Sequence, residues 1–162
     1  MEIILNLDYT GTVIENYSQL IDGEEIEVFS EVCKMIDELN IAKFSVCFKK
    51  WDNRFNKTDF AYDFTSIAIE IRGLIDFLTN KSNKYLLFFY ELDRKIMFRF
   101  KNEQLIDFEI LNSIENTVFF SGILNVNELK NKVEKLLDAF RDLLYKFFPK
   151  AYECLSKHQY II

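Results

Sequence analysis

The apolar pattern between Asn125 and Pro149 constrains the fold more than any other feature of this sequence. Its apolar residues recur at intervals of three and four, the spacing of one face of an α-helix. They are Val126, Leu129, Val133, Leu136, Leu137, Phe140, Leu143, Leu144 and Phe147. Asn125 is a good N-cap, Glu128 lies at the third helical position, and Pro149 ends the pattern. We therefore predict a helix of roughly 22 residues, about 33 Å long.

The stretch before this helix predicts an antiparallel meander. Four short runs, each rich in β-branched and aromatic residues, are separated by short turns. The runs are Tyr85–Glu91, Lys95–Lys101, Leu105–Leu111 and Thr117–Leu124. Because a sheet with one apolar face must bury it, we expect the long helix to cover that face.

The register of the second and third runs follows from matching their apolar faces, since a slip of one residue would exchange the two faces of a strand. A three-residue loop at 102–104 satisfies the match. It places Phe98 opposite Phe108. It also places Arg99 opposite Asp107.

The same reasoning predicts the turn between the first and second runs. We expect Leu92, Asp93 and Arg94 to form a three-residue loop that pairs Glu91 with Lys95. Such cross-strand pairs contribute roughly 0.2 to 1 kcal/mol each. They therefore specify the register more than they stabilise the sheet.

The remaining segments predict further strands and helices. Ile3–Leu7 and Phe44–Phe48 favour strands, whereas Glu24–Leu39 and Ser66–Thr79 show helical spacing. The apolar residues of 151–162 predict that part of the tail docks. The expected class is α+β, with an antiparallel meander sheet of about four to six strands, a long covering helix at the C-terminal end and one or two further helices.

Length and composition place the chain among single globular domains. It has 162 residues, of which 49% are apolar and 28% charged, and a chain of this length buries about 70% of its unfolded surface. We expect one domain over residues 1–162. The first residues lack the pattern of a signal peptide, and the longest apolar run, Leu86–Tyr90, is too short to span a membrane. A soluble, cytoplasmic protein without a membrane partner is expected.

The negative charge is concentrated in one segment. Residues 22–38 hold seven acidic residues and one lysine, so they carry the whole formal charge of −6 while the rest of the chain is balanced. An acidic surface attracts basic partners and repels nucleic acid. The candidate partner-binding residues are Asp22, Glu24, Glu25, Glu27 and Glu31. The alternative is a solvated helix face that favours solubility.

A basic segment follows the acidic one. Residues 43–57 hold five basic residues and one aspartate, interleaved with aromatic residues. This composition could stack on single-stranded nucleic acid. Phe44 and Phe48 are already assigned to a strand of the core, which leaves Trp51 and Phe55 as the available aromatic residues, so we expect no nucleic-acid partner.

One short string suggests chemistry. Asp8-Tyr9-Thr10-Gly11-Thr12, directly after an apolar run, resembles the first motif of haloacid dehalogenase-like phosphotransferases. That resemblance implies an alternative function as a phosphatase, with Asp8 as nucleophile and magnesium as cofactor. The chain lacks the Gly-Asp and Asp-Asp sequences that would complete the magnesium site, and a meander cannot supply parallel crossovers. The other interpretation of the string is a turn that ends a strand.

Other reactive residues give no recognisable site. Cys33, Cys47 and Cys154 are widely spaced and His158 is the sole histidine, so neither a disulfide framework, a zinc site nor a histidine-based triad can be drawn. We therefore expect no cofactor, no metal and no catalytic residue.

The order of the elements resembles small bacterial immunity proteins that protect cells from polymorphic or contact-dependent toxins. The resemblance covers about residues 66–148: a short helix, four meandering strands and a long amphipathic helix that opens with Asn125-Val126-Asn127-Glu128-Leu129. It implies a non-catalytic protein that occludes a cognate toxin domain, commonly a basic nuclease. The toxin, its activity, the binding face and the oligomeric state stay open.

Overall fold

The chain folds as an α+β protein, as its sequence predicts. The computed structural model describes residues 3–9, 25–48, 64–89 and 93–158. Its elements, in order, are β1 (Ile3–Tyr9), α1 (Glu25–Glu38), β2 (Ala42–Phe48), α2 (Thr65–Asn80), β3 (Lys84–Phe89), β4 (Arg94–Phe100), β5 (Leu105–Asn112), β6 (Val118–Asn125), α3 (Val126–Phe147) and α4 (Pro149–His158). The predicted meander is the four-stranded antiparallel sheet β3-β4-β5-β6, and β1 and β2 form a separate antiparallel pair.

The predicted register between β4 and β5 is confirmed. Phe98 pairs with Phe108, and Arg99 pairs with Asp107. The loop is residues 102–104, because the backbone N–H of Lys101 donates to the carbonyl of Leu105 at 2.9 Å. The side chain of Asn102 closes this loop by accepting hydrogen bonds from the backbone N–H groups of Gln104 and Leu105, each at 2.9 Å.

The predicted register between β3 and β4 is wrong. Lys95 pairs with Phe88 rather than with Glu91, so β3 is displaced by three residues from the predicted position. The reason is the burial of β3: Leu87 and Phe89 are the inward residues, at 6% and 0% exposure. They must share a face with Ile96 of β4, and the predicted register would have placed them on the opposite face.

The start of the long helix is as predicted. Asn125 caps α3, and its side chain accepts a hydrogen bond from the Glu128 backbone N–H at 3.1 Å. The helix ends at Phe147, and Phe148 is its C-cap. Pro149, which the sequence predicted to end the helix, is the first residue of α4. Ala151 and Leu155 of α4 are fully buried, so this part of the tail docks as expected.

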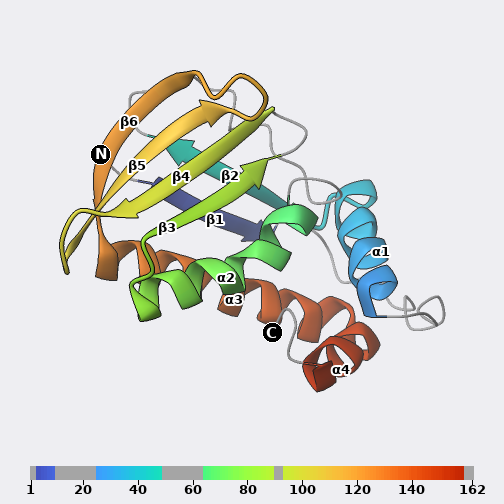
Figure 1. Ribbon diagram of the computed structural model, residues 1–162. Helices are drawn as coiled ribbons and strands as arrows, with labels where there is room; N and C mark the ends of the chain where they lie inside the picture. The colour runs from blue at the N-terminus through green and yellow to red at the C-terminus, as the bar shows by residue number, and fades with distance from the viewer. Residues whose placement is uncertain (1–2, 10–24, 49–63, 90–92, 159–162) are drawn as a thin grey trace.

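Several elements together cover the inner face of the meander. α3 and α2 lie beneath the sheet, whereas α1 and α4 gather at one end of the molecule (Figure 1). A small internal cavity of about 20 Å³ lies where the sheet meets β2, α2 and α3. It is lined by Val46 of β2, by Ile67, Ile71 and Leu74 of α2, by Leu87, Phe89, Ile96 and Phe98 of the sheet, and by Leu129 and Val133 of α3. The long helix therefore covers the sheet together with α2 and β2, not alone.

Candidate functional site

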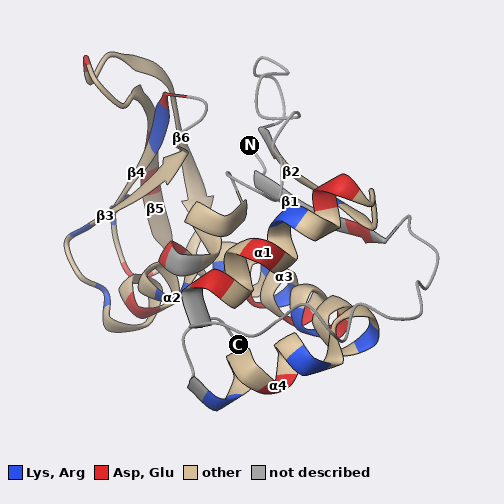
Figure 2. Cartoon of the chain, turned by 90° about the vertical axis from the view of Figure 1, so that its right-hand side faces the viewer, with Lys and Arg blue, Asp and Glu red and all other residues tan. Residues whose placement is uncertain are grey.

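The exposed face of α1 carries two of the predicted partner-binding residues. Glu27 and Glu31 lie four positions apart, which places them one above the other on one side of the helix. Both are exposed, while Phe29 and Val32 on the other side are fully buried. This side of the molecule faces the viewer in Figure 2, where acidic residues are visible along α1. Outside the described part lie Asp22, Glu24 and the side chain of Glu25.

The two carboxylates on α1 are like charges at neighbouring helical positions. Such an arrangement lowers helix stability by roughly 0.2 to 0.5 kcal/mol. The next basic residue along the helix is Lys34, whose Nζ lies 3.9 Å from Oε1 of Glu38 in an exposed ion pair. Cations supplied from outside would therefore interact favourably with Glu27 and Glu31.

Asp8, the candidate nucleophile of the alternative function, lies in β1. Its side chain is exposed, and it stands opposite Lys43 in the antiparallel pair of β1 with β2. All strand pairs in the described part of the chain are antiparallel. Across residues 3–9, 25–48, 64–89 and 93–158, no three or more His, Cys, Asp and Glu side chains are grouped so that they could hold a metal ion. Residues 10–24, which include the rest of the motif, are not described.

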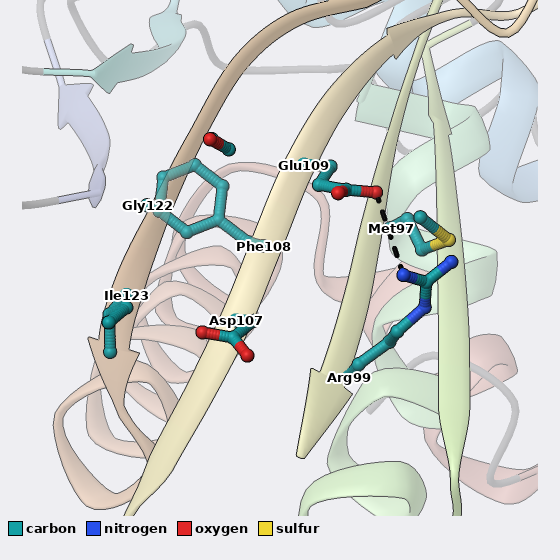
Figure 3. A pocket seen from close by; sticks show the side chains of 8 residues that line it. Met97, Arg99, Asp107, Phe108, Glu109, Gly122 and Ile123 are labelled. Carbon is teal, nitrogen blue, oxygen red and sulfur yellow. Dashed lines mark ion pairs between the residues drawn. The ribbon is translucent and has the colours of Figure 1, made fainter. Parts of the chain in front are cut away.

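A hollow of about 280 Å³ lies on the outer face of the meander, away from the helices (Figure 3). The hollow could not be predicted from the sequence, because polar residues on the outer face of a strand give no sign of the shape they enclose. It is lined by Met97, Arg99, Asp107, Phe108, Glu109, Ser121, Gly122 and Ile123. On β6, the small side chain of Ser121 leaves space on this face.

The charged residues around the hollow pair diagonally across the strands. Arg99 and Asp107 are opposite in register, yet the guanidinium of Arg99 lies 3.8 Å from Glu109. The ammonium of Lys101 lies 3.9 Å from Asp107. These partly exposed pairs balance the charge of the hollow, which therefore offers polar contacts without a strong net attraction for either sign of charge.

Exposed apolar side chains are concentrated on the β5–β6 hairpin. Of the five large apolar side chains that are exposed in the described part of the chain, four belong to the β5–β6 hairpin. They are Ile114, Val118, Phe119 and Ile123. The guanidinium carbon of Arg94 lies 4.0 Å from the centre of the Phe119 ring, a cation–π geometry. The sequence pattern assigned the last strand to the sheet, but it did not show that this strand would stay at an exposed edge.

The opposite edge of the sheet is joined to α2 through Glu70. One carboxylate oxygen of Glu70 accepts a hydrogen bond from the Phe88 backbone N–H at 2.9 Å. Burial raises the pKa of this carboxyl, and the hydrogen bond from Phe88 only partly offsets the effect. The hydroxyl of Tyr85 donates to the backbone carbonyl of Glu70 at 2.5 Å. Burial, and then the negative charges of Glu70 and Asp76, raise the pKa of Tyr85 to about 12.

The cysteines give no sign of a reactive centre in the described residues. Cys33 is buried in α1, and burial raises the pKa of its thiol to about 12, although a hydrogen bond with Thr65 acts in the opposite direction. Cys154 is half-buried in α4. The side chains of Cys47 and His158 are not described.

The basic segment is described only at its start. Lys43 is exposed on β2, and Phe44 is buried, as the sequence predicted. The stretch from 49 to 63, with Trp51 and Phe55, lies outside the described residues. No helix in the described part of the chain is long and apolar enough to cross a membrane.

Comparisons with protein-family models, with curated proteins and with solved structures found no match to this chain.

Proposed function

We propose that this chain is an immunity protein, which binds a cognate toxin domain and blocks it without catalysing a reaction. The observation that carries the proposal is the exposed pair Glu27 and Glu31 on α1, within the segment that holds the whole net charge of the chain. A face of carboxylates can imitate the phosphates of a nucleic acid and pair with the lysines and arginines of a basic nuclease. Long-range attraction would also accelerate the association.

The packing of α1 against the core supports this proposal. Phe29, on the buried side of the helix, contacts Phe140 of α3 edge to face, with ring centres 5.8 Å apart. The acidic face of α1, which carries Glu27 and Glu31, therefore belongs to a helix that packs on the core and not to a loop. A preorganised surface loses less conformational entropy when it binds a partner.

The proposal is tested with the product of the neighbouring gene, where the toxin of an immunity protein is expected to be encoded. We expect a complex whose association rate falls steeply with ionic strength. The double variant Glu27→Lys/Glu31→Lys should associate at least about tenfold more slowly and lose most of the salt dependence. A matched control, Glu103→Lys/Glu115→Lys, makes the same change of charge at exposed turns of the meander and should retain most of the rate.

Two results would contradict the proposal. The first is an association rate that both double variants change equally, since only net charge would then matter. The second is hydrolysis of a generic phosphoester with Mg²⁺ that is lost in Asp8→Asn, since that would make the phosphatase alternative correct.

A further inference from the structure

The open edge of the meander is a second candidate interaction surface, independent of α1. Among the described strands, β6 pairs only with β5 (Figure 1). The ladder can be followed from the backbone N–H of Val126, which donates to the carbonyl of Gln104 at 2.9 Å. Because hydrogen-bonded and non-hydrogen-bonded pairs alternate in antiparallel strands, the backbone groups of Gly122 point toward β5. Those of Ser121 and Ile123 point away from it.

The other edge strand of the sheet, β3, is already hydrogen-bonded to α2. The Phe88 backbone N–H of β3 donates to the carboxylate of Glu70 at 2.9 Å, so α2 takes a hydrogen bond that a further strand would need. Tyr85, on the same strand, donates its hydroxyl to the backbone carbonyl of Glu70. The sheet can therefore be extended at β6 but not in the same way at β3.

The composition of β6 favours pairing with a copy of itself. Residues 116–127 contain no charged side chain, so two such strands can meet without bringing like charges together. Val118 and Ile123 are 50% and 44% exposed. Exposed edge strands usually carry a lysine, a proline or an inward-pointing charge that prevents pairing, and β6 carries none of these. A bulge opposite Ile110 and Leu111 disturbs only the first part of the strand.

We propose that β6 is a dimerisation strand, through which two copies of this chain pair antiparallel about a two-fold axis. The two four-stranded sheets then form one continuous sheet. Because α2 occupies the β3 edge of each copy, the assembly closes at two chains and does not extend into a fibre. α1 lies on the opposite side of the molecule from β6 (Figure 1), so its acidic face should stay accessible in the dimer.

The first test measures the mass of the purified chain in solution over a range of concentrations. We expect the wild type to reach twice 19.4 kDa. Ser121→Lys places a charge on each copy at the shared edge and should move the transition to a concentration at least about tenfold higher. Ser156→Lys, the same substitution on the exposed surface of α4, is the control and should behave as the wild type. Far-ultraviolet circular dichroism of both variants establishes that they fold.

The second test uses amide hydrogen exchange of individual residues. The amides of Ser121 and Ile123 should be protected in the wild type at high concentration and exchange rapidly in Ser121→Lys, while that of Gly122 should stay protected in both. A chain that is monomeric at high concentration and exchanges rapidly at Ser121 and Ile123 overturns the proposal, and so does a dimer that Ser121→Lys leaves intact. Protection that arises only after another protein is added would assign the edge to that protein instead.

Discussion

The contact between Gly73 and Tyr85 fixes how closely α2 approaches the sheet. A Cβ atom added to Gly73 would lie 2.6 Å from the Tyr85 hydroxyl oxygen and 3.1 Å from the ring carbon Cε2. The ring cannot retreat freely, because the same hydroxyl donates to the carbonyl of Glu70. Glycine at this helical position is therefore explained by the close packing and not by backbone conformation.

We expect Gly73→Ala to destabilise the protein by about 1 kcal/mol, although alanine within a helix ordinarily stabilises by about that amount relative to glycine. Urea unfolding monitored by circular dichroism measures the change. In a Tyr85→Ala background the obstacle is gone, so the same substitution should become stabilising. A loss of stability that is equal in both backgrounds would contradict the explanation.

The raised pKa of Glu70 predicts that the stability of the protein depends on pH. Its pKa in the folded protein is raised above the ordinary value of 4.5, chiefly by burial. A raised carboxyl pKa contributes stability that is fully present below 4.5 and is lost as the pH rises through the folded value. Glu70→Gln keeps an acceptor for the Phe88 N–H but removes the titration. Its free energy of unfolding, relative to wild type, should therefore increase from acidic to neutral pH.

The matched control for this pH dependence is Glu153→Gln, at an exposed position on α4. Its stability relative to wild type should change less over the same pH range. Because Glu70 is only partly buried, we expect a difference below about 1 kcal/mol between the acidic and neutral ends. A Glu70→Gln curve parallel to that of the wild type would show that the carboxyl does not titrate differently on folding.

At the scale of single elements, the cap of α3 is the clearest link between sequence and structure. We predict that Asn125→Ala costs about 1 kcal/mol, because it removes the acceptor for the Glu128 N–H. Asn131→Ala, at an exposed position inside the same helix, should be neutral or slightly stabilising, since alanine is the better helix former. Thermal unfolding compares the two. Equal losses would mean that the capping bond contributes nothing measurable.

The elements also show where pattern matching succeeds and fails. The β4–β5 register could be predicted because β5 alternates from Ile106 to Ile110 and the apolar residues of β4 match it, with Phe98 and Phe108 buried on the same face. β3 contains the unbroken apolar run Leu86–Phe89, so alternation could not identify which residues face inward. Its register is set instead by Leu87 and Phe89 in the core and by α2 at the edge. Contacts of this tertiary kind leave no local signal in the sequence.

Across the whole molecule, the sequence predicted the class, every described element except the helix α4 and the segment that carries the charge, but only part of the surfaces. The charge of residues 22–38 is visible in composition, and the exposure of Glu27 and Glu31 followed from helical spacing. The hollow near Ser121 depends on how β4, β5 and β6 lie side by side, and the difference between the two sheet edges depends on how α2 packs against β3. They required the three-dimensional structure because residues distant in sequence create them.

Three aromatic rings join the end of the molecule that carries α1 to the rest of the core. Phe140 of α3 contacts Phe29 of α1, and its ring centre lies 4.7 Å from that of Phe64 at the start of α2. We predict that Phe140→Ala costs about 3 to 5 kcal/mol, because it leaves a cavity where three elements meet. Tyr145→Ala, on the same helix at a position 68% exposed, should cost less than about 1 kcal/mol.

The stability of the Phe140→Ala variant also reports on the proposed binding surface. If the rings hold α1 in place, the amides of α1 should lose more protection from hydrogen exchange than those of β4 and β5, and association with a basic partner should slow even where the protein stays folded. Equal loss of protection across all elements would instead mean that the protein unfolds as one unit. The acidic face would then depend on global stability and not on the contact between Phe29 and Phe140.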